Sequence, residues 1–385
     1  MKEKRWEEDY LNGKKNPFSN QVVRREVGAI YTKGTYSKEG MLTEETLDTK
    51  YVLVFLFDES TLSFGFTFFD LSTLQFHLGQ FTDDSMLSKF RTLVARVRPV
   101  EVVCSSRLKT SAPACVLRAW PQPPAFSLLH PETVLGARDA EGVIEHYLAG
   151  REVPEAVAEA VSDYNGGRMA VAALGMWMEY LASLLLAERT VALAEFHTYH
   201  HDQGFGVNNR LLMDAQAMKH LEVFEVEANN KLTTSGSLYE LLNRWSTKFG
   251  SRLLRGWIQA PLYNENKLKE RIDAVEWLTN KKEVIEKWKK KMTGIPDLER
   301  WLARVYKFSV ESDSKAIYIN RNLMFRLHEF YLLITEFEKI VSKLLSIFPV
   351  KYNNHSSRLD SLTYVSFKFS QRFFELNSYF PFSAY

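Results

Sequence analysis

The sequence has few of the features that mark secreted, membrane or metal-binding proteins. Its two cysteines, Cys104 and Cys115, can form neither a disulfide framework nor a CxxC pair for zinc. The longest apolar run, residues 51–57, is far shorter than the roughly 20 residues that a membrane-spanning helix needs. Residues 1–9 are mostly charged and lack the apolar core of a secretory signal. We therefore expect a protein of a reducing compartment with no membrane partner.

Motifs for nucleotide and metal chemistry are also missing. The sequence contains no GxxxxGK[ST] phosphate loop, no GxGxxG and no HExxH. The formal net charge of +2 is too small to predict nucleic-acid binding by itself. Hydrophobic residues make up 45% of the chain, which excludes a mainly disordered protein. Composition therefore predicts a folded chain that does not hydrolyse ATP and has no catalytic, cofactor-binding or metal-binding residue of its own.

Apolar periodicity divides the chain into a strand-rich part and a helical part. The expected strands lie at residues 22–35, 51–57, 64–69, 74–78 and 100–103. A helix is expected over residues 85–97, and the prolines between residues 113 and 124 indicate a loop. Strands that alternate with a helix predict an α/β layer domain. Further helices are expected at residues 170–184, at 237–245 behind a capping box, at 267–278, and from residue 296 onward.

The most regular helical signal lies near the C-terminal end. Eight apolar residues there alternate steps of four and three: Leu323, Leu327, Phe330, Ile334, Phe337, Val341, Leu344 and Phe348. This heptad spacing predicts a helix on the order of 45 Å long, packed along one narrow apolar face. An ordinary core helix is the alternative. Residues 351–385 follow it, are rich in aromatic side chains and obey no helical period.

Three clusters of polar residues offer chemistry, and each also has a structural explanation. Residues 197–202 contain three histidines that could bind a metal, but no third ligand lies at a recognisable spacing and nearby glycines indicate a loop. Asp70, at the end of an apolar strand, could hold magnesium as in a nuclease, although aspartate is common in turns. Its neighbouring aspartates are Asp58, Asp83 and Asp84. The lysines of residues 281–291 could contact phosphates, but they also fit the solvent-facing side of a helix.

Four segments resemble the core domain of the MutS family of DNA mismatch-repair proteins. Residues 247–262 follow the family pattern TxxGxRLLRxWLxxPL, and residues 271–276 resemble RxDAVE. Residues 213–223 and 297–302 resemble LDAxxxxNLEL and DLERLL, and all four segments occur in the family's order. The best landmarks are Thr247, Gly250, Arg252, Arg255, Trp257 and Pro261. We expect these landmarks to be structural, with the two arginines bracing neighbouring helices or else reaching DNA.

Helical spacing adds one expectation for this core segment. We expect one buried face on its helix, made of Leu253, Leu254, Trp257 and Ile258.

The N-terminal half resembles the large subunit of the eukaryotic MutS-alpha heterodimer. The segments that carry this resemblance are residues 24–27, 32–35, 79–84, 90–95 and 99–102. Such subunits contact a mismatched base through an F-x-E motif, which residues 57–59 and 373–375 fit. Roughly two chance matches are expected for so short a pattern, so we transfer that role to neither and assign no residue to DNA.

The resemblance, over roughly residues 20–348, implies the following architecture. Residues 22–163 form an RNase H-like α/β connector domain, and residues 164–350 form an all-α core and lever domain with the long heptad-patterned helix. Residues 1–21 are a remnant of a preceding domain or a linker, and residues 351–385 are a divergent aromatic-rich tail. We expect the chain to be a fragment of a longer family member.

The implied function is nuclear DNA mismatch repair. Family members recognise mismatched double-stranded DNA as an ATP-dependent heterodimer with a smaller MutS-homologue subunit, and a MutL homologue binds through the connector. ATP and magnesium belong to the full-length family, and we expect no cofactor in this chain. One alternative is a truncated, non-catalytic binding module for a repair partner. The other is an RNase H-like nuclease that uses Asp70.

Overall fold

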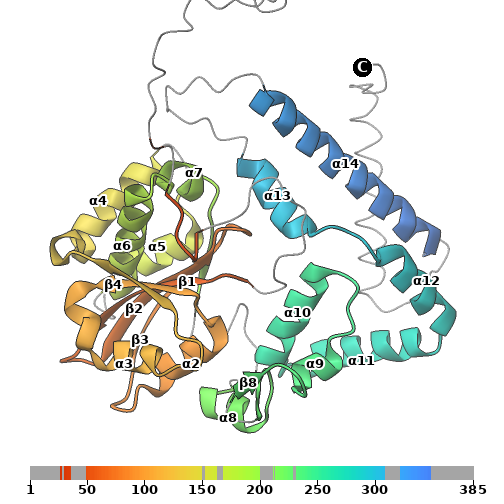
Figure 1. The fold of residues 1–385 in the computed structure, drawn as a ribbon, viewed down its shortest axis with the longest axis horizontal. Coiled ribbons are helices and arrows are strands. Elements are labelled where there is room, and N and C mark those ends of the chain that lie inside the picture. The colour runs from red at the N-terminus through yellow and green to blue at the C-terminus, as the bar shows by residue number, and fades with distance from the viewer. Residues whose placement is uncertain are drawn as a thin grey trace, which may run out of the picture.

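The computed structural model contains an α/β region followed by a mostly helical region (Figure 1). The structure describes residues 27, 30–35, 49–149, 152–162, 168–199, 211, 213–228, 231–307 and 321–347. This order of the two regions confirms the coarse fold class expected from the sequence. The expectations for residues 1–21, 200–209 and 351–385 lie outside the described residues. Among the described helices, none is long and apolar enough to cross a membrane.

A six-stranded sheet lies at the centre of the α/β region. Its strand order is β5-β4-β1-β2-β3-β6, with antiparallel pairing of β1 with β2 and β2 with β3, and parallel pairing elsewhere. The strands are β1 (Val52–Asp58), β2 (Ser63–Asp70), β3 (Gln75–Thr82), β4 (Glu101–Ser105), β5 (Ala125–Leu129) and β6 (Glu195–Thr198). The first four strands were expected. Residues 30–35 were also expected to be extended, but they end in a turn beside the sheet.

Helices cover both faces of the sheet, which makes β1 and β2 apolar on both sides. Alternation in β1 sends Val52 and Val54 to one face and Leu53 and Phe55 to the other. The first face is covered by α4 (Ala137–Leu148), α5 (Glu155–Ser162), α6 (Met169–Ser183) and α7 (Ala187–Val191). The second is covered by α2 (Ser88–Val97) and α3 (Ala112–Arg118). Short 3-10 turns occur at η1 (Ser106–Thr110) and η2 (Pro131–Thr133).

The loop predicted around the prolines between residues 113 and 124 is partly wrong, because Ala112–Arg118 form helix α3. Pro113 lies in the first turn of the helix, where its missing N–H removes no intrahelical hydrogen bond.

Helix α6 belongs to the sheet region rather than to the helical one. It is apolar on all sides and buries Trp177, whose ring contacts Phe69, Phe76 and Phe196. It also approaches β2 closely: a Cβ on Gly65 would lie 2.1 Å from the carbonyl oxygen of Met169, so glycine is needed there. The boundary expected between residues 163 and 164 therefore does not coincide with a break in packing.

The helical region begins at residue 211 and ends in a 27-residue helix. Its elements are α8 (Ala215–His220), the hairpin β7 (Val226–Ala228) and β8 (Lys231–Thr233), α9 (Leu238–Leu242), α10 (Lys248–Gln259), α11 (Glu265–Thr279), α12 (Lys282–Met292), α13 (Leu298–Lys307) and α14 (Arg321–Ile347). Ser237 caps α9 as expected, since its hydroxyl accepts a hydrogen bond from the Glu240 N–H at 3.2 Å. Helix α13 lies between the sheet region and α14 (Figure 1), and both α12 and α13 contact α14.

The long helix was expected correctly, but its packed face was not. Leu327 and Phe330 of the heptad pattern are 54% and 46% exposed. Among the α14 side chains that the structure describes, the buried ones are Glu329, Leu333 and Ile340, which lie one position before members of that pattern. One residue turns an α-helix by about 100°, so the packed face differs from the apolar seam. The reason is that Glu329 bonds to side chains of α13, which draws its own face inward.

Candidate functional site at the junction of the two regions

Helix α2 contacts α8 of the helical region (Figure 1). The helix is fixed at its start by Asp83, whose carboxylate accepts the backbone N–H of Lys89 at 3.0 Å and of Phe90 at 2.8 Å. Such capping satisfies backbone donors that have no partner within the helix. Asp83 therefore helps to set the direction in which α2 meets the helical region.

Arg96, in the last turn of α2, bonds to both regions. Its guanidinium donates to the Tyr199 hydroxyl at 3.2 Å and to the Met213 carbonyl at 3.4 Å. Its own carbonyl accepts a 2.6 Å hydrogen bond from the side-chain amide of Gln259, at the end of α10. Arg96 and Gln259 are both buried, and a buried polar group without partners would be costly. These directional bonds therefore fix the position of α10 against α2.

Neighbouring contacts support this attachment. Arg98 forms an ion pair with Glu225, and the Ala215 N–H donates to the Thr92 hydroxyl at 3.3 Å. A small apolar cluster lies beside them, made of Met218, Val223 and Phe224 with Ala95 of α2 and Met213, Tyr239 and Ile258 of the helical region. The attachment is thus mostly polar with a small apolar centre.

The landmark residues at the start and end of α10 have local structural roles. The Thr247 hydroxyl accepts the Gly250 N–H at 3.3 Å and caps the helix. A Cβ on Gly250 would lie 2.8 Å from that hydroxyl and 3.1 Å from the Trp245 ring, so the close cap favours glycine. Pro261 follows the helix, and its carbonyl accepts the Leu211 N–H at 2.7 Å.

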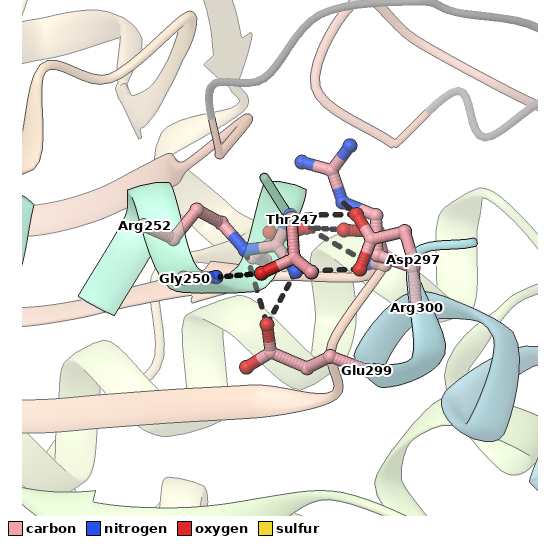
Figure 2. A network of polar contacts seen from close by, with 8 residues as sticks. Thr247, Gly250, Arg252, Asp297, Glu299 and Arg300 are labelled. Atoms are coloured by element: carbon pink, nitrogen blue, oxygen red, sulfur yellow. Dashed lines mark hydrogen bonds and ion pairs between the residues drawn. The ribbon is translucent and has the colours of Figure 1, made fainter. Parts of the chain in front are cut away.

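Arg252 joins α10 to the start of α13 (Figure 2). Its guanidinium donates to both oxygens of Asp297, at 2.6 and 2.7 Å, and from Nε to Glu299 at 3.0 Å. The Arg252 and Asp297 side chains are 10% and 14% exposed, and such two-pronged pairs are among the stronger polar contacts in proteins. Burial raises the pKa of Asp297, but the Arg252 guanidinium outweighs this effect and holds that pKa below its usual range.

Helix α13 in turn bonds to the long helix. The Trp301 indole donates to Glu329 at 3.1 Å, and the Arg304 guanidinium pairs with the same carboxylate oxygen at 2.9 Å. Lys307, at the far end of α13, donates to the Leu71 carbonyl at 2.5 Å in the turn after β2. Helix α13 therefore contacts the sheet region and the long helix at the same time.

Together these contacts form a continuous series from the sheet region to α14, which we call the polar path. Its members are Arg96, Gln259, Arg252, Asp297, Glu299, Trp301, Arg304 and Glu329. Every step is a hydrogen bond or an ion pair, or lies within one helix. Such an arrangement fixes angles between helices, and it offers no nucleophile or general base aimed at a substrate.

The two other landmark residues of α10 stack on neighbouring side chains. The Arg255 guanidinium lies 4.6 Å from the Phe224 ring centroid and 5.6 Å from that of Tyr239. The Arg271 guanidinium lies 3.8 Å from the Trp257 ring centroid. These are cation–π geometries, which contribute modestly at exposed sites.

The buried face expected on α10 is wrong. Leu253 is 52% exposed and Trp257 is half-buried. The buried residues of the helix are Gly250, Ser251 and Gln259. Packing follows the side that carries the polar bonds to α2 and α9, which include the 2.7 Å contact of the Ser251 and Tyr239 hydroxyls. Of the expected stripe, Leu253 is exposed, Leu254 and Trp257 are half-buried, and Ile258 packs against the small apolar cluster.

Asp70 does not converge with the other aspartates of the nuclease alternative. Asp58 and Asp70 end two antiparallel strands, β1 and β2, and therefore lie at opposite ends of the sheet. Each accepts hydrogen bonds from its own turn: Asp58 from Ser60, and Asp70 from Ser72. Among the described residues, no group of three His, Cys, Asp or Glu side chains could hold a metal.

The remaining candidate residues also have structural surroundings. His197 lies in β6 rather than in a loop, and its ring stacks on that of His77, with 5.2 Å between centroids. Phe57 lies in β1, whereas residues 373–375 are outside the described part. In α12, Ile285 and Trp288 are half-buried and most of the lysines are exposed, as expected for a solvent-facing side.

Comparisons with known proteins agree with this two-part structure. A model of MutS domain II matches residues 50–122, and a model of MutS domain III matches residues 216–363. The chain belongs to the MutS family. It is 30% identical to the DNA mismatch repair protein Msh6 of Homo sapiens over 343 residues, which cover 77% of this chain and 25% of that protein. It is 29% identical to the MSH6 protein of Arabidopsis thaliana over 334 residues, with 78% and 25% coverage.

A bacterial relative gives the same result. The DNA mismatch repair protein MutS of Chlorobium chlorochromatii is 27% identical over 291 residues, which cover 74% of this chain and 30% of that protein. The chain thus spans about a quarter of the length of its MSH6 relatives. The domain III match extends to residue 363, past the end expected at residue 350 for the core and lever domain.

The segments that carry the sequence resemblance cover the middle of the polar path but not its two ends, Arg96 and Glu329. Arg252, Asp297 and Glu299 lie in the segments that resemble the MutS core, but their pairing was not foreseen. Gln259 lies in the same matched segment as Arg252, but its bond to α2 was not predicted, and no pattern in the sequence singles out Glu329.

Proposed function

We propose that this chain acts in DNA mismatch repair as the part that holds an α/β connector domain and a long lever helix in a defined arrangement. The polar path carries this proposal, because it joins the sheet region to α14 through directional bonds. The names of the relatives supply the process: they are DNA mismatch repair proteins.

The finer assignments of our proposal concern fold and partners. The order of β3, β2, β1, β4 and β5, with the first three antiparallel and the last two parallel to β1, supports an RNase H-like connector. We assign α14 as a lever. In the longer family members the chain would work with a smaller MutS-homologue subunit on mismatched DNA in the nucleus, and a MutL homologue would bind the connector.

We further propose that the chain itself is not an ATPase. Its sequence contains no phosphate-loop motif, and the ATP and magnesium of the family would be held by other parts of the longer proteins. Purified chain should show no magnesium-dependent thermal shift with ATP. Binding at a hundred times the dissociation constant would stabilise the fold by about 2.7 kcal/mol, so a clear shift would contradict the assignment.

The mechanical part of the proposal can be tested by distance measurement in the intact chain. Cys115 is exposed and Cys104 is buried, so a spin label can be placed on Cys115 of α3 and on a Lys339→Cys variant in α14. A single narrow distance distribution is expected, and Arg252→Ala should broaden it. Lys269→Ala, which removes an exposed ion pair on α11, should leave it unchanged. A broad distribution in the parent protein, or no response to Arg252→Ala, would refute the proposed link.

DNA binding supplies a separate test. The chain alone should prefer a G·T mismatch over matched duplex by less than tenfold in competition binding, which corresponds to about 1.4 kcal/mol. A larger preference would require a mismatch-contacting residue within this chain, and would contradict a purely connecting role.

A further inference from the structure

Glu101 holds four hydrogen-bond donors from three separate parts of the chain. It is the first residue of β4 and is buried. One carboxylate oxygen, Oε1, accepts from the Ser127 hydroxyl at 2.5 Å and the Tyr180 hydroxyl at 2.6 Å. The other, Oε2, accepts from the Thr32 hydroxyl at 2.6 Å and the Gly34 N–H at 2.8 Å. Oε1 therefore faces the sheet region itself, and Oε2 faces the segment that precedes it.

The carboxylate is stabilised in its ionised form despite its burial. Burial raises the pKa of Glu101, but the hydrogen bonds from Ser127, Thr32, Tyr180 and Gly34 outweigh it and hold the pKa below its usual range. A buried carboxylate that lost these donors would be costly, because nothing would replace the water it gave up. Losing the Thr32 hydroxyl or the Gly34 N–H as a donor to Glu101 should therefore cost free energy.

The segment is shaped to fit the carboxylate. The Thr32 N–H donates to the Thr35 hydroxyl at 2.7 Å, which closes a turn and presents the Gly34 N–H toward Glu101. A Cβ on Gly34 would lie 2.3 Å from Cγ2 of Val52, a side chain buried in β1, and 3.0 Å from Oε2 of Glu101. Glycine is therefore required for the segment to reach the carboxylate.

The same contacts place the segment beside the junction of the two regions. Lys33 lines a cavity of about 100 Å³ together with Arg98 and Glu225, the ion pair that joins α2 to the helical region. Ile30 is attached on the other side, where its N–H donates to the Leu184 carbonyl at 2.9 Å. Residues 30–35 thus contact β1, β4, the region after α6 and the junction.

We propose that Glu101 is an intramolecular binding site for residues 30–35, and that this contact, the Glu101 latch, fixes where the chain before the sheet joins the molecule. Two segments that resemble the MutS family, residues 32–35 and 99–102, meet at this carboxylate, and the polar path uses neither. The latch is independent of the mismatch-repair assignment. It makes Glu101 a positioning residue for the sequence that precedes the sheet.

Amide hydrogen exchange in the full chain tests the latch, because the two oxygens have different partners. Thr32→Val removes a donor to Oε2, together with the contacts of the same hydroxyl with Thr35 and Tyr180, and changes the side-chain shape little. Exchange at residues 30–35 should rise at least tenfold while β1 to β3 stay unchanged. Ser127→Ala removes a donor to Oε1 and is the matched control, which should change residues 30–35 by less than twofold. Equal effects of the two variants, or no change at residues 30–35 with Thr32→Val, would overturn the latch.

A second variant tests the same site by shape alone. Gly34→Ala keeps all the donors but introduces the clash with Val52, so it should also raise exchange at residues 30–35 and leave the strands protected. Faster exchange throughout β1 to β3 would show that Glu101 and its partners are part of the general core, and would overturn the proposal of a separable latch.

Discussion

Different interactions stabilise the α/β region and the helical region of this chain. Among the described residues, the largest fully buried side chains all lie in the α/β region, among them Trp177, Phe55 and Phe64. In the helical region, α11 is described throughout and has no buried residue, and Ile272 and Val275 are each 62% exposed. The first region therefore depends on a large buried apolar area, whereas the second has a smaller apolar cluster and a few buried apolar residues to which directional polar bonds are added. The direction of the long helix thus rests on few residues.

The largest expected effect is in the sheet core. Trp177→Ala removes a fully buried indole that contacts Phe69, Phe76 and Phe196, and it leaves a cavity. The free energy of unfolding should fall by about 3–5 kcal/mol in urea titrations. A loss below about 1 kcal/mol would show that the core is not the main support of the α/β region.

The next largest effect is expected at Arg252. Arg252→Ala leaves the Asp297 carboxylate half-buried without its main partner, and should cost roughly 3 kcal/mol, the low end of the range for buried pairs. The control is Lys269→Ala, which breaks the 2.7 Å pair with Glu265 on α11. Those side chains are 66% and 80% exposed, so this loss should stay under about 0.5 kcal/mol. Similar losses for the two variants would mean that the polar path contributes no more than a surface pair.

The stability of the α/β region should begin to fall at a higher pH than that of the helical region. Burial lowers the pKa of His77 to about 3, and neighbouring His197 adds to this effect. The folded state keeps His77 neutral, whereas the unfolded chain binds a proton there below about pH 6.5. The free energy of unfolding of the α/β region should therefore decrease as the pH is lowered, by at most about 1.4 kcal/mol per pH unit. Asp297 has a depressed pKa, so its stabilising effect is lost only as pH falls below the usual aspartate range, near 3.9.

Urea unfolding between pH 7.5 and 5 measures this difference. His77→Phe keeps a ring next to Phe68, 4.7 Å away in the parent protein, and should flatten the slope. An unchanged slope in that variant would exclude His77 as the titrating group.

The smallest expected effects concern the stacked residues of α10. Trp257→Ala should cost about 1–2 kcal/mol, because the ring is half-buried beneath Arg271. Arg255→Ala, which loses contacts with the Phe224 and Tyr239 rings, should cost about 1 kcal/mol. Both values can be compared with Trp177→Ala under the same urea conditions. If Trp257→Ala lowered the free energy of unfolding as much as Trp177→Ala does, the apolar face of α10 would have to be covered.

The same contrast explains what could be predicted from the sequence. The strands β1 and β2 are nearly continuous apolar runs, and α14 has a long helical period, so local patterns identified them. The partners of Glu101 lie 26 to 79 residues away, and Arg252 lies 45 residues from Asp297. No local period reveals such pairs. The face of α14 was misassigned for the same reason, since Glu329 is turned inward by partners on another helix.

The central claim is that the polar path, more than the apolar contacts of Leu333 and Ile340, holds the long helix in place. Hydrogen exchange of residues 326–340 in Arg252→Ala, compared with Lys269→Ala and the parent chain, tests it most directly. We predict at least tenfold faster exchange in α14 with Arg252→Ala, no change with Lys269→Ala, and unchanged protection of β1 to β3 in both. Unchanged protection of α14 in Arg252→Ala, or an equal loss in α14 and in the sheet, would contradict the account.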